Sequence, residues 1–213
     1  YRNKAGYAAI VAYQKFIDSK KETDEAKLLS WRQKAVDSML RFARVFHSDK
    51  RSPSVLTNAA EYLFSLNQYQ RAIEVSEALI KDNKKLDRSL KETAFGIIAH
   101  SYFKLENYGK AEQNYLAQRA LLSSKSPEYA DVTNRLAAAI YKNAEQMSAT
   151  KEQDNAIKKM LMSKATKVEL NATPKLSVIP AIFPFNASSA SANAWPIPRT
   201  VPIKPIEGMA QIR

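Results

Sequence analysis

Apolar residues recur every three or four positions through most of this 213-residue chain. Between residues 28 and 46, one such stripe consists of Leu28, Trp31, Ala35, Met39, Phe42 and Phe46. This spacing places the apolar side chains on a single face of a helix. The sustained alternation of apolar and polar residues that indicates a half-buried strand is not found in any segment of the sequence. The pattern therefore predicts an all-α fold.

Capping residues mark where several of these helices begin. Thr23 is the expected N-cap of one helix, with acidic residues in the turn that follows. Ser52 and Ser126 each precede a proline that suits the first helical position. Together with the apolar stripes, these signals predict eight helices, over residues 5–19, 24–47, 53–66, 69–82, 89–105, 108–123, 127–147 and 152–164. Their short connections favour antiparallel packing of successive helices.

Prolines separate this helical body from the end of the chain. Of the nine prolines, seven lie in residues 171–213, a segment that is also rich in Ala, Ser and Asn. Such a composition is typical of irregular or extended chain, so we expect a Pro-rich tail there. Three interpretations of this tail stay open: a docking peptide for a partner, a segment that folds back into the protein's own groove, or an altered C-terminus that lacks the capping repeat of a solenoid.

The helical body contains an internal repeat. Five of its residues recur after a period of 39, so that Ala60, Leu63, Leu66, Tyr69 and Ala72 correspond to Ala99, Tyr102, Leu105, Tyr108 and Ala111. A small residue lets two helices approach closely, and a large residue three positions later fills the groove between them. The tyrosine then packs back from the turn, and the last alanine begins the contact face of the second helix.

This pattern resembles the tetratricopeptide repeat family, which has the same order of small residue, large residue, turn tyrosine and alanine. Two features depart from the family: the period exceeds its usual length of about 34 residues, and Lys84 replaces the proline that commonly ends a repeat. A weaker likeness is to bacterial cell-envelope proteins that contain such repeats. The resulting division is a divergent leading pair in 1–52, repeats in 53–164 (53–84, 92–123 and, in part, 131–164) and the tail in 171–213.

The resemblance implies a right-handed stack of helix pairs whose concave groove holds a partner polypeptide. It therefore predicts a non-catalytic scaffold for protein–protein interaction. In the family, groove residues lie on the first helix of each pair, between the packing positions. The residues expected to bind the partner are Asn58, Glu61, Ser65, Ile97, His100, Ser101, Lys104 and Asn134. An ordinary solvated helix surface is the alternative interpretation of the same residues.

Composition argues against several kinds of chemistry. The absence of cysteine excludes disulfides, thiolate zinc sites and a cysteine nucleophile, and four glycines leave little scope for Gly-rich phosphate loops. The two histidines, His47 and His100, lack the spacing of a His-Glu-x-x-His metal motif, and no Gly-x-Ser-x-Gly elbow occurs. We therefore expect no catalytic residue, no metal site, no cofactor and no enzymatic activity.

Charge supplies the alternative function. The chain has 33 Lys and Arg against 21 Asp and Glu, a net charge of +12, which would suit a helical repeat that binds nucleic acid. The positive excess is spread along the chain, however, and most aromatic residues fall at packing or turn positions.

No run of about 20 apolar residues predicts a membrane span. Both the bacterial cell envelope (periplasm) and the cytoplasm fit the sequence, and the oligomeric state stays open.

Overall fold

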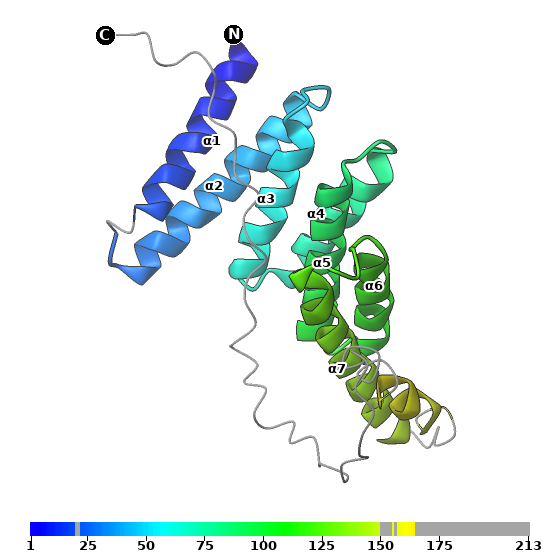
Figure 1. The fold of residues 1–213 in the computed structure, drawn as a ribbon. Coiled ribbons are helices and arrows are strands. Elements are labelled where there is room, and N and C mark those ends of the chain that lie inside the picture. The colour runs from blue at the N-terminus through cyan, green and yellow to red at the C-terminus, as the bar shows by residue number, and fades with distance from the viewer. Residues whose placement is uncertain (20–21, 150–154, 156, 165–213) are drawn as a thin grey trace.

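The computed structural model describes residues 1–19, 22–149, 155 and 157–164 (Figure 1). Seven helices are α1 (Arg2–Asp18), α2 (Glu25–Val45), α3 (Ser52–Ser65), α4 (Tyr69–Asp82), α5 (Arg88–Lys104), α6 (Tyr108–Ala120) and α7 (Pro127–Ala149). Residues 157–164 are also helical, and the described residues contain no strand. The all-α prediction is confirmed, with helix bounds within a few residues of those expected. The tail predicted at 171–213 lies outside the described residues.

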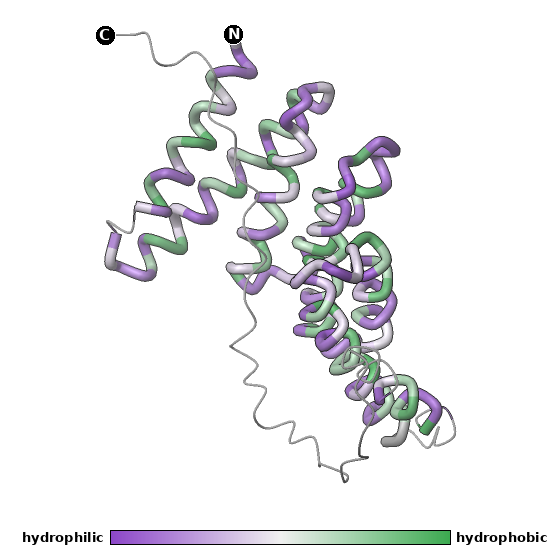
Figure 2. The backbone as a smooth tube through the Cα atoms, in the orientation of Figure 1, coloured by the Kyte–Doolittle hydropathy of each residue, from purple (hydrophilic) through white to green (hydrophobic). Residues whose placement is uncertain are grey.

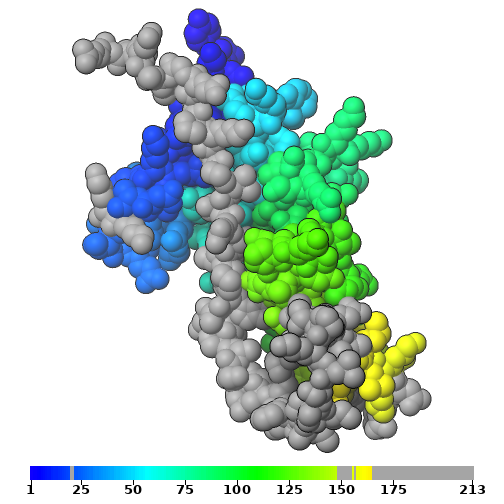
Figure 3. Space-filling view, in the orientation of Figure 1, coloured from blue at the N-terminus to red at the C-terminus, as the bar shows by residue number. Residues whose placement is uncertain are grey.

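The helices form a stack in chain order. Each helix packs against the next one, and α3 also packs against α5. Hydrophobic and hydrophilic residues alternate along the helices, as amphipathic packing requires (Figure 2). The described helices follow one another from α1 at one end to residues 157–164 at the other (Figure 3). The fold is therefore a helical-repeat solenoid built from antiparallel pairs.

Two apolar clusters form the core of this stack. The first extends from α1 to α5 and includes the fully buried Ile10, Met39 and Leu63. The second lies between α5, α6 and α7 and includes Tyr115 and Leu136, which are also fully buried. Helix α5 contributes to both clusters, so it joins the two halves of the molecule.

The turns at the repeat boundaries have the same geometry. Asn67 follows α3 and Glu106 follows α5, and each has a backbone φ of 58°. In both turns, the next amide donates to a carbonyl five residues earlier, at 2.9 Å, in the pairs Gln68–Leu63 and Asn107–Tyr102. This bonding closes the end of a helix in a Schellman-type turn. The period of 39 residues is therefore a repeat of backbone structure as well as of sequence.

The turn tyrosines also pack as the repeat predicts. Their rings contact a phenylalanine five residues earlier, with centroid separations of 5.3 Å for Phe64–Tyr69 and 5.1 Å for Phe103–Tyr108. The position equivalent to these tyrosines after a further 39 residues, Met147, lies inside α7. The third unit thus continues as one long helix where the first two turn, which agrees with its partial match in the sequence.

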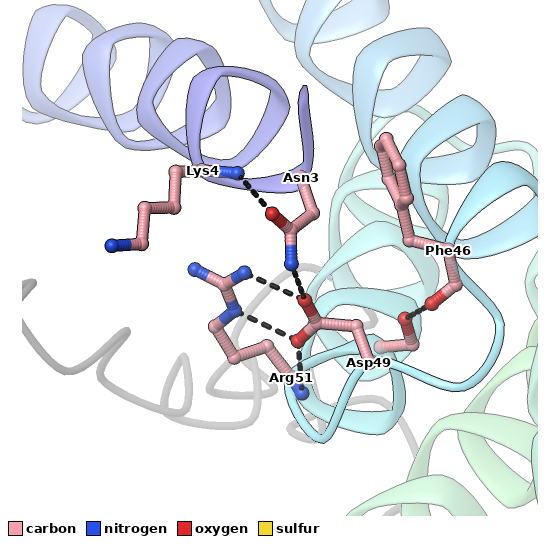
Figure 4. A network of polar contacts seen from close by, with 6 residues as sticks. Asn3, Lys4, Phe46, Asp49 and Arg51 are labelled. Carbon is pink, nitrogen blue, oxygen red and sulfur yellow. Dashed lines mark hydrogen bonds and ion pairs between the residues drawn. The ribbon is translucent and has the colours of Figure 1, made fainter. Parts of the chain in front are cut away.

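A polar network holds α1 against the loop between α2 and α3 (Figure 4). Arg51 donates to both carboxylate oxygens of Asp49, at 2.8 and 2.6 Å, and Asn3 of α1 donates to the same carboxylate at 3.0 Å. The Arg51 guanidinium also lies over the Tyr7 ring, 4.4 Å from its centroid. The hydrogen bonds from Arg51 hold the pKa of Asp49 well below its usual range. Since these groups satisfy one another, the network is a structural clamp.

Candidate functional site

The eight residues predicted to bind a partner lie on α3, α5 and α7, and most of them are buried. Five are no more than 3% exposed: Asn58, Glu61, Ile97, His100 and Ser101. Ser65 and Lys104 are half-buried, and Asn134 is exposed. The five buried residues therefore lie between helices, whereas an open groove or a solvated surface would leave them accessible. Their role in partner binding stays a prediction.

Most of the buried residues lie where α3 meets α5. The Phe64 ring of α3 contacts the His100 ring of α5 edge-on, with centroids 6.1 Å apart. Glu61 lies one turn before Phe64 on the same face of α3, and Asn58 lies a further turn back. We call Asn58 and Glu61 of α3, together with Ile97, His100 and Ser101 of α5, the α3–α5 seam.

Polar atoms in the seam lack hydrogen-bond partners. Within the part of the chain that the structure describes, none is found for either oxygen of Glu61, for the amide oxygen and nitrogen of Asn58, or for the hydroxyl of Ser101. An unsatisfied buried polar group costs about 1–3 kcal/mol of stability. Burial also raises the pKa of Glu61 to about 8, so its carboxyl group is mostly protonated at neutral pH.

His100, in contrast, is well satisfied. Its Nδ1 donates to the carbonyl oxygen of Gly96, one turn earlier on α5, and Arg135 of α7 donates to its Nε2. Arg135 is in turn paired with Asp131 at 2.6 Å. Burial, and secondarily the positive charge of Arg135, lowers the pKa of His100 to about 3. The imidazole is therefore neutral, with both nitrogens engaged, and it joins α5 to α7.

The internal repeat shows that Asn58 occupies a position that is otherwise apolar. The residues 39 and 78 positions later are Ile97 on α5 and Leu136 on α7. Both are fully buried in the core. A hydrophobic residue evidently fits this position in the other two pairs. The polar side chain of Asn58 is thus a feature that packing alone does not explain.

The same comparison distinguishes Glu61 from His100. Glu61 corresponds to His100, and Gly96 corresponds to Arg135, the residue that satisfies His100 from the following pair. The repeat therefore offers Glu61 no arginine at the position that serves His100. Gly96 serves close packing, because a Cβ atom there would lie 2.8 Å from the Gln118 amide nitrogen of α6. Sequence inspection missed this difference, although aligning the three first helices at the period of 39 would have revealed it.

A second feature was also missed, a cleft between α2, α3 and α4. It has a volume of about 580 Å³ and is lined by the apolar Leu40, Leu56 and Val75 together with the polar Arg44 and His47. None of the eight predicted residues lines it. The sequence signal was weak, because these apolar residues lie beside the main stripes of their helices. The lining of the cleft also includes the polar or charged residues Ser52, Glu74, Asp82 and Asn83.

Metal and membrane features can be assessed only for the described residues. Among them, no three His, Asp or Glu side chains gather as a metal site. Within the same residues, no helix combines the length and the apolar character needed to cross a bilayer. Comparison with known proteins gives no further assignment, since no family, curated protein or solved structure matches this chain.

Proposed function

We propose that this protein is a non-catalytic scaffold that binds a partner polypeptide along the first helices of its pairs, as its resemblance to tetratricopeptide repeats implies. The observation that carries the proposal is the recurrence of the helix pair and its turn after 39 residues, with Asn67 and Glu106 in the same left-handed conformation. Stacked helix pairs of this kind present a continuous surface for binding. Among the predicted residues, Ser65, Lys104 and Asn134 are half-buried or exposed, so a partner can reach them in the folded chain.

Nucleic acid is the competing ligand, because the chain has a net charge of +12. Binding of single strands generally requires aromatic faces on which bases stack. Here Phe64 and Tyr69 contact each other, as do Phe103 and Tyr108, and Tyr115 is fully buried. These rings are already used for packing, which favours the polypeptide.

The proposal can be tested by selecting peptides from a displayed random library with the full chain, in the presence of nuclease. Selected peptides should bind the wild-type protein and bind at least ten-fold more weakly to a variant with Ser65→Ala, Lys104→Ala and Asn134→Ala. Circular dichroism should show unchanged helix content. A matched control is Lys81→Ala, since Lys81 is exposed on α4 and lies outside the seam.

Other outcomes would favour the alternative. If no peptide is selected while labelled single-stranded RNA or DNA binds with a steep salt dependence, the protein is a nucleic-acid-binding repeat. If the triple variant binds selected peptides as tightly as the wild type, the first helices are not the binding surface.

A further inference from the structure

We propose that the cleft between α2, α3 and α4 binds an amphipathic helix of a partner protein, and that the two flanks of this helix carry opposite charges. The site lies mainly on the second helices of the pairs, and none of the residues predicted to line the concave groove contributes to it. It therefore does not depend on the proposed scaffold function.

The cleft offers both space and access. Helix α3 lies between α2 and α4 and packs against each of them (Figure 1). The cleft volume of about 580 Å³ is typical of ligand-binding clefts, which measure about 300–1,000 Å³. A hollow of about 260 Å³ shares Leu40 and Arg44 with the cleft and extends along α2 to Asp37. Arg44 and Ala78, which line the cleft, are exposed, so a partner can reach it in the folded chain.

The apolar part of the lining favours a helix over an extended segment. Leu40 of α2, Leu56 of α3 and Val75 of α4 all line the cleft and are half-buried. An extended peptide would place its own N–H and C=O groups against these side chains, which cannot satisfy them. A helix satisfies its main chain internally and can lay an apolar face into such a groove.

The two walls of the cleft carry opposite charges. On α4, Glu74, Ala78 and Asp82 follow one another at intervals of four residues, so they share one face. The two carboxylates lie about 12 Å apart along the helix axis, at a rise of about 1.5 Å per residue. The α2 wall presents the guanidinium of Arg44. A helix with an acidic flank toward α2 and a basic flank toward α4 would complement both walls.

These charged groups are largely free to meet a partner. Among the described residues, Arg44 and Asp82 form no ion pair and no side-chain hydrogen bond. Glu74 accepts one bond, from Gln70 at 3.3 Å. The walls thus do not neutralise each other across the cleft. The Pro-rich end of the chain is a poor occupant, because proline is not tolerated inside a helix.

Three synthetic peptides test the site on the full-length protein. Each has about 18 residues, because isolated helices shorter than about 15 are marginal, and each has the same stripe of Leu and Ala. The mixed peptide carries Glu on one flank and Lys on the other, the Glu peptide carries Glu on both, and the Lys peptide carries Lys on both. Fluorescence anisotropy should show that the mixed peptide binds at least five-fold more tightly than either of the others. A net charge of +12 alone would instead favour the Glu peptide.

Variants localise the binding. Glu74→Lys combined with Asp82→Lys gives both walls positive charge and should transfer the preference to the Glu peptide. Glu77→Lys combined with Glu128→Lys makes the same change in net charge at exposed positions outside the cleft, and should keep the wild-type order. Ala78→Trp should fill the cleft and weaken binding of the mixed peptide at least five-fold. Circular dichroism checks that each variant is folded.

Several results would overturn the proposal. The wild-type protein could bind none of the peptides, bind all three equally or prefer the Glu peptide, or the folded Glu74→Lys, Asp82→Lys variant could keep the wild-type order. If this variant dissociates a wild-type dimer in sedimentation, a second copy is the occupant. If a peptide of residues 171–213 displaces the mixed peptide, the occupant is the chain's own end.

One further variant separates the cleft from the scaffold surface. The protein with Ser65→Ala, Lys104→Ala and Asn134→Ala should bind the mixed peptide as tightly as the wild type, whether or not library selection yields peptides for the first helices. Weaker binding of the mixed peptide to this variant would place that peptide on the first helices and exclude the cleft.

Discussion

Two buried side chains make the stability of this protein depend on pH in opposite directions. Glu61 has a pKa of about 8 in the folded chain against an ordinary value of 4.5. The stabilising contribution of Glu61 to the free energy of unfolding is therefore full below pH 4.5 and is lost as the pH rises toward 8. His100 has a pKa of about 3 against 6.5. The stabilising contribution of His100 to the free energy of unfolding is full above pH 6.5 and is lost as the pH falls toward 3.

The two contributions should nearly cancel between pH 4.5 and 6.5, so the free energy of unfolding should be flat there and fall on either side. Glu61→Gln should remove the fall above pH 6.5 and leave the fall in acid. His100→Gln should do the reverse. Urea unfolding measured between pH 4 and 8 checks both expectations. If the free energy of unfolding still falls above pH 6.5 in the Glu61→Gln variant, another group causes that fall.

Two buried serines, Ser52 and Ser101, differ in whether the hydroxyl has a hydrogen-bond partner, so their replacement by alanine can be compared. The Ser52 hydroxyl donates to the carbonyl oxygen of Phe46 at 2.6 Å, whereas the equally buried Ser101 hydroxyl has no partner among the described residues. Ser52→Ala should cost about 1 kcal/mol, the net contribution of a typical hydrogen bond. Ser101→Ala should be neutral or stabilise the protein by up to about 1 kcal/mol, since alanine also favours the helix. Equal losses in urea unfolding would mean that Ser101 has a partner after all.

The ends of the helices show how much of the fold the sequence predicts. Periodicity located the helices because burial of one face dominates their formation. Individual caps were less predictable: Asp24, and not Thr23, caps α2 by accepting from the amides of Ala26 and Lys27. Ser52 begins α3 and bonds back to the preceding loop. Ser126 does accept from the amide of Tyr129, as expected. Neighbouring polar residues can exchange such roles at little cost, so spacing alone does not decide between them.

The helices that carry the candidate residues were predictable, but the burial of those residues was not. The repeat pattern placed Asn58, Glu61 and Ser101 on first helices, and in the structure all three are buried, on α3 and α5. A polar residue between packing positions is normally taken as exposed. How deeply α3 and α5 bury such a residue depends on how closely the two helices approach, which no local pattern contains. The position equivalent to Arg135, the partner of His100, is likewise 35 residues away from Glu61 in the sequence and is occupied by Gly96.

The two repeat turns yield a prediction at the scale of the element. Asn67 and Glu106 both have a left-handed φ of 58°. Asparagine tolerates this conformation, but it costs other non-glycine residues about 1 kcal/mol or more. Glu106→Gly should therefore raise the free energy of unfolding by up to about 1 kcal/mol, and Asn67→Gly should raise it by less. Thermal unfolding of the two variants checks the order, and an equal or reversed effect would contradict the explanation.

At the scale of the whole molecule, the stacked arrangement determines how far a destabilising substitution affects helices distant from it. Each helix packs mainly against its neighbours along the chain, and only α5 among the described helices supplies buried residues to both apolar clusters, Ile97 to the first and Ala99 to the second. In such an arrangement, stability is approximately a sum over units and the interfaces between them. Local opening can then occur at one end without opening the other.

Hydrogen exchange can test this separation. Met39→Ala in the first cluster and Leu136→Ala in the second each remove a fully buried side chain and should cost about 2–5 kcal/mol. Leu136→Ala should speed amide exchange in α6 and α7 and leave α1 and α2 unchanged, whereas Met39→Ala should do the reverse. Exchange in α5 should respond to both, because α5 belongs to both clusters. Faster exchange throughout all seven helices in either variant would instead mean that the stack unfolds as one cooperative unit, and that α5 transmits the loss of one cluster completely to the other.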